Sequence, residues 1–297
     1  MAATTEKRLP LKSGDRVLAR GWAVLQRLVR NRMALVGLVL VVLEIAMALF
    51  APFMALQSPD EINTLAMLSS PSATHLLGTD DLGRDTFSRL IYGARVSLTA
   101  STIAVALAML VGVPLGLVAG YLGGVFDEAV MRILDSVMAL PPLVLALTIA
   151  AVLGPGLVNG MLAIAVVAVP TFTRLIRGQV LSIKHDDYVV AARSIGATSR
   201  AIIFRHVLPN AINPVIVQAA LGVGFAIITE SSLSFIGLGA QPPTPSWGSM
   251  VQVGFQYLEL APWLVLAPAV IIFVAVLGFN LLGEGLRDML DPNVRMR

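Results

Sequence analysis

The side chains that usually carry chemistry are sparse in this chain, and they are not grouped as catalytic or metal sites require. None of its three lysines follows a glycine, so the sequence contains no Walker A loop that could hold nucleotide phosphates. No pair of its three histidines has metal-ligand spacing, there is no cysteine, and no G-x-S-x-G elbow is present. We therefore predict no catalytic residue, no metal and no cofactor in this chain, and no nucleic-acid partner.

Two carboxylates lie inside long apolar runs, where an ionisable group is costly and is a functional candidate by default. Glu44 lies near the middle of the first run, and Glu230 lies near the end of the fifth. The hydroxyls of Ser231 and Ser232 follow Glu230. We take these four residues as candidates for a transport pathway or its gate. A structural hydrogen bond to a neighbouring helix or to nearby backbone is the alternative for each carboxylate.

A polar, basic stretch, DDYVVAARSIGATSRAIIFRHVLP at residues 186–209, separates two very apolar runs. It predicts two short helices. Asp186 or Asp187 can cap the first helix, and their charge suits its N-terminus. Gly196 suits the left-handed residue that ends that helix.

The second half of this stretch predicts another short helix. Thr198 or Ser199 can cap it, and Pro209 is expected to end it. Its apolar side chains are expected to pack back on the ends of the spans; they are Ile202, Ile203, Val207 and Leu208. An amphipathic helix that docks in a groove is a standard recognition mode, so the element suits a partner outside the bilayer.

The composition places these features in a membrane protein. Of the 297 residues, 57% are hydrophobic and 13% are charged, and the mean hydropathy is +0.83. Soluble domains carry about 25% charged residues, so a chain this apolar needs lipid as its solvent. We predict an all-α polytopic membrane protein with six transmembrane helices. They are expected over residues 33–56, 97–119, 129–153, 157–176, 211–235 and 263–282.

The segments outside these spans complete the predicted domain organisation. Residues 1–32 are expected to form a cytosolic tail followed by a basic amphipathic helix in the membrane interface. Residues 57–95 form an external segment that is too long for a tight turn. A core with five of the helices covers residues 96–285, and residues 286–297 form a charged cytosolic tail.

Small residues and prolines predict how the spans pack. Gly112, Gly116 and Gly120 recur every four residues on one helix face, which permits close approach of a second helix. Pro141 and Pro142 are expected to break the third span within the membrane. Such a break is tolerated where other protein or a cavity covers the freed backbone groups.

The positions of the basic residues predict the orientation of the chain, because cytosolic segments carry an excess of Lys and Arg. With a cytosolic N-terminus, 18 of the 21 Lys and Arg residues lie inside. The other three, Arg84, Arg89 and Arg95, lie outside. This asymmetry predicts cytosolic N- and C-termini and puts residues 186–209 in the cytosol.

Residues 186–209 resemble the EAA signature of the permease subunits of ATP-binding-cassette (ABC) importers. That signature consists of Glu-Ala-Ala, three residues, Gly, nine residues and Ile-x-Leu-Pro. The spacing is fully kept here around Gly196, while Val190 replaces the Glu and His206 stands at the Ile position. The carboxylate of the signature is therefore missing, whereas the helix–turn–helix pattern remains.

Other segments resemble the C-type subunit of the dipeptide, oligopeptide and nickel permease family. They are LGTDDLGRDTFSRLIYGARVSL at 77–98, SLSFIGLGAQPPTPSWGSM at 232–250, FNLLGEGLRDMLDP at 279–292 and RNRMALVGLVLV at 30–41. The resemblance extends over nearly the whole chain. It is specific for the family and says little about the cargo.

The resemblance implies the transmembrane domain of a type I ABC importer in a prokaryotic cytoplasmic (inner) membrane. An external binding protein would deliver the substrate, and a second, B-type permease subunit would share the pathway. Two cytosolic ATP-binding subunits would hold ATP and Mg and dock on residues 186–209. The residues expected to form this ATPase-coupling site are Asp187, Tyr188, Val189, Ala191, Ala192, Arg193, Ile195, Gly196 and Arg200.

The side-chain types suggest how the docking would work. The apolar strip of the first helix is expected to consist of Tyr188, Val189, Ala192 and Ile195. The basic side chains expected to meet acidic residues on the ATPase are Arg193, Arg200 and Arg205.

The leading interpretation is a non-catalytic permease subunit of an ATP-driven peptide importer, with membrane lipid around it. A first alternative keeps the machine and changes the cargo to nickel chelates, glutathione or another small solute. A remote alternative is an ATP-independent secondary transporter or channel, which would predict two similar halves and midplane ion-binding carboxylates. No repeat is visible, and Glu44 is the one plausible midplane carboxylate in the sequence.

Overall fold

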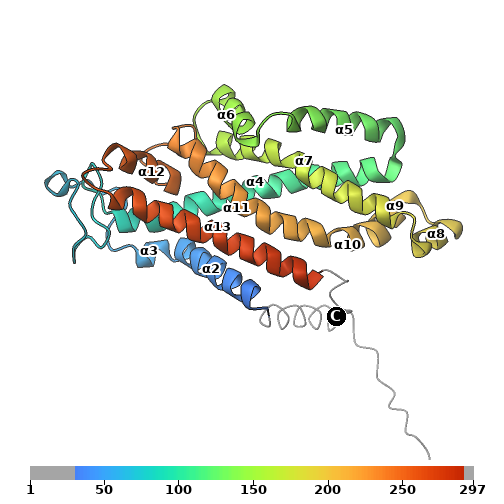
Figure 1. The fold of residues 1–297 in the computed structure, drawn as a ribbon, viewed down its shortest axis with the longest axis horizontal. Helices are drawn as coiled ribbons and strands as arrows, with labels where there is room; N and C mark the ends of the chain where they lie inside the picture. Colours follow the sequence, from blue (N-terminus) through green and yellow to red (C-terminus); the bar gives the residue numbers. More distant parts are fainter. Residues whose placement is uncertain (1–30, 291–297) are drawn as a thin grey trace, which may run out of the picture.

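The computed structural model describes residues 31–290, and all regular elements in that range are helices. Long helices run side by side along the long axis of the molecule, with short elements at both ends (Figure 1). The helices are α2 (Arg32–Leu49), α3 (Ala51–Met54), η1 (Thr64–Ala66), α4 (Thr86–Leu122), α5 (Gly124–Met138), α6 (Pro142–Leu153), α7 (Leu157–Ile183), α8 (Asp187–Ser194), α9 (Ser199–Ile202), η2 (Ile203–Val207), α10 (Leu208–Ala211), α11 (Asn213–Phe235), α12 (Trp247–Gln256) and α13 (Trp263–Leu290).

The number of candidate spans agrees with the sequence. Five of the described helices, α2, α4, α7, α11 and α13, are long and apolar enough to cross a membrane. The helices α5 and α6 form a sixth if they are counted as one broken span, because they meet at an angle of 89°. The break lies where Pro141 and Pro142 were expected to interrupt the third span. Pro142 opens α6, where the missing N–H of a proline costs nothing.

The helices α4 and α7 form the centre of the bundle, and the three glycines lie between them. A Cβ atom on Gly112 would lie 2.9 Å from the carbonyl oxygen of Val169, and one on Gly120 would lie 3.1 Å from that of Arg177. A Cβ on Gly116 would collide with the backbone of Thr173. Any larger residue at these positions would force the two helices apart, so the glycines set their separation.

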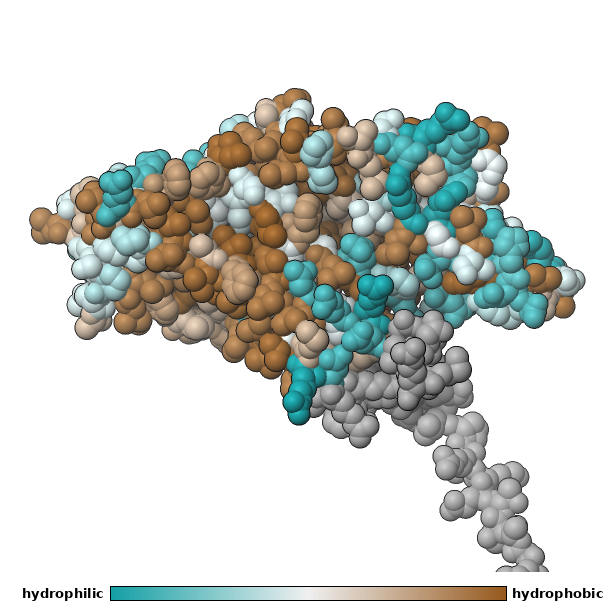
Figure 2. Space-filling view, in the orientation of Figure 1, coloured by the Kyte–Doolittle hydropathy of each residue, from teal (hydrophilic) through white to brown (hydrophobic). Residues whose placement is uncertain are grey.

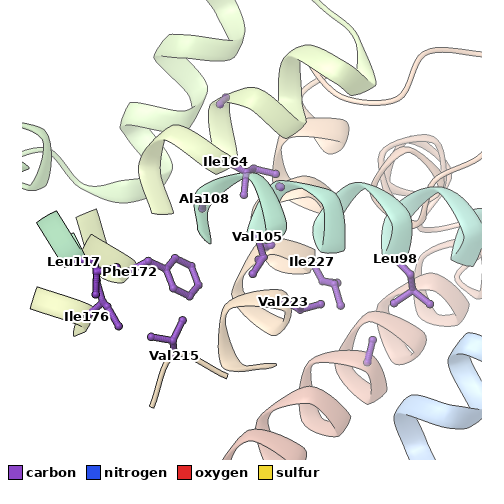
Figure 3. Packing of buried hydrophobic residues seen from close by; sticks show 14 of the residues in the cluster. Leu98, Val105, Ala108, Leu117, Ile164, Phe172, Ile176, Val215, Val223 and Ile227 are labelled. Carbon is purple, nitrogen blue, oxygen red and sulfur yellow. The ribbon is translucent and has the colours of Figure 1, made fainter. Parts of the chain in front are cut away.

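The hydrophobic core lies where α4, α7 and α11 meet. Val105 of α4, Phe172 of α7 and Val223 of α11 are buried members of one cluster (Figure 3). Gly222 of α11 lies beside Phe172 and Val105, and a Cβ at this position would be in ordinary van der Waals contact with both side chains, at 3.6 Å. This core continues to the end of the molecule that carries α8, because Val189 and Ile202 belong to the same cluster.

The outer faces of the bundle are apolar as well. Large hydrophobic side chains such as Leu43 on α2 and Phe273 on α13 are exposed. Figure 2 shows hydrophobic residues over most of the bundle and hydrophilic ones gathered in the half that carries α8 and α9. Exposed apolar surface on this scale fits helices that face hydrocarbon.

One of the predicted segment boundaries falls elsewhere in the structure. The helix α4 begins at Thr86, so the last ten residues of the predicted external segment 57–95 belong to the long helix. Asp85 caps this helix through a hydrogen bond to the Ser88 N–H. The predicted interfacial helix within residues 1–32 lies almost wholly outside the described residues, as does the end of the predicted tail 286–297.

Candidate functional site

The candidate site is the connection between α7 and α11, hereafter the coupling segment (residues 186–209). Its first helix, α8, begins at Asp187, with Asp186 at the N-cap position. The Asp186 side chain makes no capping hydrogen bond, so its carbonyl oxygen alone accepts from the Val189 and Val190 N–H groups. The carboxylate of Asp187 lies in the first turn, where negative charge suits the helix N-terminus.

The turn after α8 is a Schellman motif. The Ala197 N–H donates to the Ala192 carbonyl at 3.1 Å, and the Gly196 N–H donates to the Arg193 carbonyl at 3.0 Å. Gly196 has φ +85°, the left-handed conformation expected from the sequence. No atom lies within 4 Å of the position that its Cβ would occupy. The glycine is therefore required by its backbone angle and not by lack of space.

The second helical part follows the predicted start but not the predicted end. Thr198 caps α9, since its hydroxyl accepts from the Ala201 N–H at 3.3 Å. The prediction that Pro209 ends this helix is wrong, because the helical path continues through the π-turn η2 into α10 and reaches Ala211. Pro209 is the second residue of α10 and directly follows the π-turn.

The widened turn also explains how the segment is anchored. Ile202 and Val207 are both buried in the core. In a regular α-helix, residues five apart point in different directions, whereas one turn with i→i+5 hydrogen bonds brings them to the same side. The predicted packing of the second helix on the ends of the spans is therefore achieved by a π-turn.

The predicted apolar strip of α8 is divided between two faces. Val189 is fully buried and Ala192 nearly so, and both belong to the core of this chain. Tyr188 and Ile195 are exposed, Ile195 to 87%. The prediction that all four face a partner therefore needs correction, because two of them attach the helix to the bundle. The periodicity shows that an apolar face exists but not which neighbour covers it.

The exposed face combines apolar and basic side chains. The other predicted coupling residues, Asp187, Ala191, Arg193, Gly196 and Arg200, are all exposed. Val190, which stands where the signature has Glu, is also exposed. Beside α8, an open hollow of about 550 Å³ is lined by five residues of the second helical part: Thr198, Arg200, Ala201, Phe204 and Arg205.

Asn210 joins the two helical parts and was not predicted. Its side-chain amide donates to the Tyr188 hydroxyl at 3.3 Å and to the His206 carbonyl at 2.7 Å. Partial burial raises the pKa of the Tyr188 phenol, and the Asp186 carboxylate raises it further. The phenol therefore stays neutral at physiological pH and can accept the amide hydrogen bond. No sequence signal indicated this contact, since the two residues are 22 positions apart.

Polar contacts connect the spans next to the coupling segment. The Lys184 ammonium donates to the Gly120 carbonyl at 3.0 Å, which satisfies one of the free carbonyl groups at the end of α4. Arg177 of α7 makes a two-pronged ion pair with Asp127 of α5, with both N···O distances 2.6 Å. These contacts tie α4 and α5 to the helix that leads into the coupling segment.

Two of the three predicted pathway residues at the end of α11 are buried. Glu230 is buried, and its Oε1 accepts from the Ser234 hydroxyl at 2.7 Å. Ser231 is buried, and a Cβ on Gly248 of α12 would collide with its backbone, so α12 lies directly on this end of α11. The Ser232 hydroxyl donates to the Ile228 carbonyl of its own helix. The role of Glu230 in a pathway stays a prediction.

Glu44 is the other buried carboxylate. It lies on the inner face of α2, a helix that packs mainly on α13 and α4. Neither of its oxygens has a hydrogen-bond partner among residues 31–290. Its function also stays a prediction.

A larger cavity of about 700 Å³ lies beside the coupling segment, between α7, α11 and the end of α13. Its polar lining consists of Gln179, Asn210, Asn213, Gln218 and Arg287. Side-chain amides both donate and accept hydrogen bonds, so the cavity can hold an uncharged polar group. Within the described range, no three His, Cys, Asp or Glu side chains come together as a metal site would need.

Two family models match the sequence. Residues 112–296 match the binding-protein-dependent transport system inner membrane component. Residues 21–71 match the N-terminal transmembrane domain of oligopeptide transport permease C. Together the two models cover both the coupling segment and the first span.

Several known proteins are similar along almost their whole length. The dipeptide transport system permease protein DppC of Alkalihalophilus pseudofirmus is 46% identical over 270 residues, which are 91% of this chain and 89% of that protein. The glutathione transport system permease protein GsiD of Pectobacterium atrosepticum is 41% identical over 91% of this chain and 90% of its own length. Among solved structures, an inward-facing MetNI methionine ABC transporter chain has a TM-score of 0.55 at 18% identity and covers 68% of this chain and 96% of its own. That likeness concerns the fold.

Proposed function

This chain belongs to the family of inner-membrane components of binding-protein-dependent transport systems, and from that premise we propose that it is a permease subunit of an ATP-driven importer of short peptides. The observation that carries the proposal is the 46% identity with a dipeptide transport permease over nine-tenths of both chains. The fold of an ABC importer membrane domain supports it.

The coupling segment supports the proposed dependence on separate ATPases. Several of its apolar and basic side chains are exposed at one end of the bundle, where no other part of residues 31–290 covers them (Figures 1 and 2). We assign direct ATPase contact to Tyr188, Ile195 and the basic residues Arg193 and Arg200. Val189 and Ala192 are buried, so they would act by holding α8 in position.

The remaining parts of the proposed complex follow from the family and from the charge distribution. A B-type permease subunit would complete the pathway, two cytosolic subunits would bind ATP and Mg, and an extracytoplasmic binding protein would deliver the peptide. The bias of Lys and Arg supports cytosolic termini and a cytosolic coupling segment. The membrane would then be the cytoplasmic membrane of a prokaryote.

Reconstitution tests the proposal. The chain is co-expressed with a B-type permease and two ATPases from the same organism, and the purified complex is placed in liposomes. We expect uptake of a labelled dipeptide that requires ATP and the peptide-loaded binding protein. The chain reconstituted alone at the same density is the control and should transport nothing. Uptake by the chain alone, or failure of the ATPases to co-purify, would contradict the proposal.

Glutathione is a second candidate cargo, because a relative that is 41% identical is a glutathione transport permease. The same liposomes separate the two. For a peptide importer, unlabelled dipeptide should compete with the labelled dipeptide at much lower concentration than glutathione does. The reverse order of competition would assign glutathione as the cargo.

A further inference from the structure

Asn210 lies at the junction between the coupling segment and the span that follows it. It is the third residue of α10, and α11 begins at Asn213. Only Ile212 separates the two helices. A group that is held by Asn210 is therefore held at the start of α11 (Figure 1).

The side-chain amide of Asn210 is oriented by its own helical path and reaches back to α8. Its nitrogen donates to the His206 carbonyl, one turn earlier, at 2.7 Å. The same nitrogen donates to the Tyr188 hydroxyl at 3.3 Å. A primary amide has two N–H groups, so both bonds can exist together. The shorter bond orients the amide, and the longer one then fixes the place of the Tyr188 hydroxyl.

Tyr188 transmits this contact to the first turn of α8. It is the second residue of that helix. Its ring centroid lies 6.3 Å from that of His206, with the two planes tilted by 52°. This separation is within the range of attractive aromatic pairs. A ring contact and a hydrogen bond therefore join the start of α8 to the second helical part.

The buried apolar residues of α8 do not determine its orientation by themselves. They are Val189 and Ala192, which are three positions apart and so lie on one line along the helix. Burial of apolar surface is non-directional, so the helix could roll about that line. Tyr188 precedes Val189 and is turned from it by about 100° around the helix axis. A directional hydrogen bond at that position opposes the roll.

We propose that Asn210 is a positioning residue for energy coupling. By holding the Tyr188 hydroxyl, it fixes the rotation of α8 relative to α11. The inference rests on the proposed function, in which the exposed face of α8 receives an ATPase. An α8 of fixed rotation passes a movement of the ATPases to α11 as one rigid body, whereas an α8 that rolls loses part of that movement.

Two variants remove the contact, and a third is the matched control. Tyr188→Phe removes the hydroxyl alone and keeps the ring that faces His206. Asn210→Ala removes the amide. The control is Ser194→Ala, because the Ser194 hydroxyl donates at 3.0 Å to Val190 of the same helix and ties α8 to nothing else. All three side chains are exposed, so each variant should fold like the parent.

The first measurement determines whether the contact fixes α8. The chain contains no cysteine, so spin labels can be attached at Ile195→Cys, directly after α8, and at Phe225→Cys in α11, two exposed positions. Pulsed electron paramagnetic resonance on the full-length chain in detergent gives the distribution of distances between the labels. Tyr188→Phe and Asn210→Ala should broaden it, and Ser194→Ala should not. An unchanged distribution in the first two variants would show that Asn210 does not fix α8, and the proposal would be wrong.

The second measurement is the number of peptides transported per ATP hydrolysed by the complex in liposomes. Uptake at saturating peptide-loaded binding protein should fall about two- to tenfold in Tyr188→Phe and Asn210→Ala, which is the range that one ordinary hydrogen bond can produce. ATP hydrolysis should fall less, so fewer peptides cross per ATP. The half-saturating concentration of binding protein should stay the same. The double variant should behave like Asn210→Ala, because the second change has no bond left to remove.

A purely structural role predicts a different result. It lowers the amount of active complex, so uptake and hydrolysis fall by the same factor and the number of peptides per ATP stays constant. That constancy, or an equal loss in Ser194→Ala, would overturn the proposal. If the parent complex itself shows no ATP-dependent uptake, the proposed function is wrong, and the distances between the spin labels still decide whether Asn210 fixes α8.

Discussion

The two polar ends of the molecule use the same kinds of side chain in opposite ways. At the coupling segment, Arg193 and Arg200 point into solvent, and the element is attached by a few buried apolar residues. At the other end, Arg84 and Arg89 are buried and share the carboxylate of Asp80. The first end presents its charges to a partner, whereas the second uses them to hold loops and helices together.

This difference determines what each charge contributes to stability. Exposed charges and ion pairs contribute between nothing and about 1 kcal/mol, because water screens them. Removing one partner of a buried pair costs about 3–5 kcal/mol, because the other charge is left without compensation. Mutations of the exposed charges at the coupling segment should therefore change function at nearly constant stability, and mutations of the buried charges at the opposite end should change stability first.

The largest effect is expected for Asp80→Ala. Arg84 and Arg89 would both lose their shared carboxylate in a buried environment, and two backbone N–H groups would lose their acceptor. We expect the free energy of unfolding to fall by about 3–5 kcal/mol. The midpoint of thermal unfolding in detergent and the yield of assembled complex measure this loss.

The matched control for Asp80→Ala is Asp187→Ala at the coupling segment. Asp187 is exposed in the first turn of α8 and pairs with no described residue. Its removal should leave the unfolding midpoint unchanged. If both variants lower the unfolding midpoint equally, the burial of a charge does not determine its contribution to stability.

An intermediate effect is expected for Gly196→Ala. Its φ of +85° costs an L-residue about 1–2 kcal/mol, although no atom obstructs the new methyl group. The strain would act on the turn between α8 and α9, so we expect reduced ATP-dependent uptake and a small fall in the unfolding midpoint. Both are measured on the reconstituted complex.

Gly178 offers the control for this substitution. It also has open space around its Cβ position, but it lies within α7 at an ordinary helical angle. Gly178→Ala should leave the chain as stable as the parent or more stable by up to about 1 kcal/mol. A loss of stability at Gly178 as large as that at Gly196 would mean that the backbone angle is not the cause.

Local features of both regions could be predicted from the sequence. The left-handed turn at Gly196 and the cap at Thr198 depend on residues within a few positions of each other. The Gly112, Gly116 and Gly120 stripe and the break at Pro141 are also local patterns, and the structure has a close helix contact and a broken span at these places. Periodicity and turn chemistry are sufficient for such features.

Long-range contacts could not be predicted in the same way. The Asp127–Arg177 pair joins residues 50 positions apart, and the Tyr188–Asn210 contact depends on the π-turn between them. Residues 80–89 gave no chemical signal by spacing, because their charges matter only once Arg84 and Arg89 are buried together. The sequence shows which side chains are present, but only the tertiary packing determines which of them come into contact.

The smallest effect on stability is expected for Ile195→Ala. Together with Val189→Ala, this variant tests whether the exposed and the buried face of α8 have different roles. Ile195 is 87% exposed, so its truncation should change the free energy of unfolding by less than about 0.5 kcal/mol. Val189→Ala, six residues earlier, removes fully buried atoms and should cost about 1–3 kcal/mol. Binding of the ATPases should respond in the opposite order, with the larger loss for Ile195→Ala, because an exposed apolar side chain is the one available to fill a groove on a partner. Titration of the purified ATPase onto the detergent-solubilised permeases measures this affinity. If Ile195→Ala binds the ATPase as well as the parent does, the exposed face of α8 is not the docking surface, and the partner must contact the second helical part around Phe204.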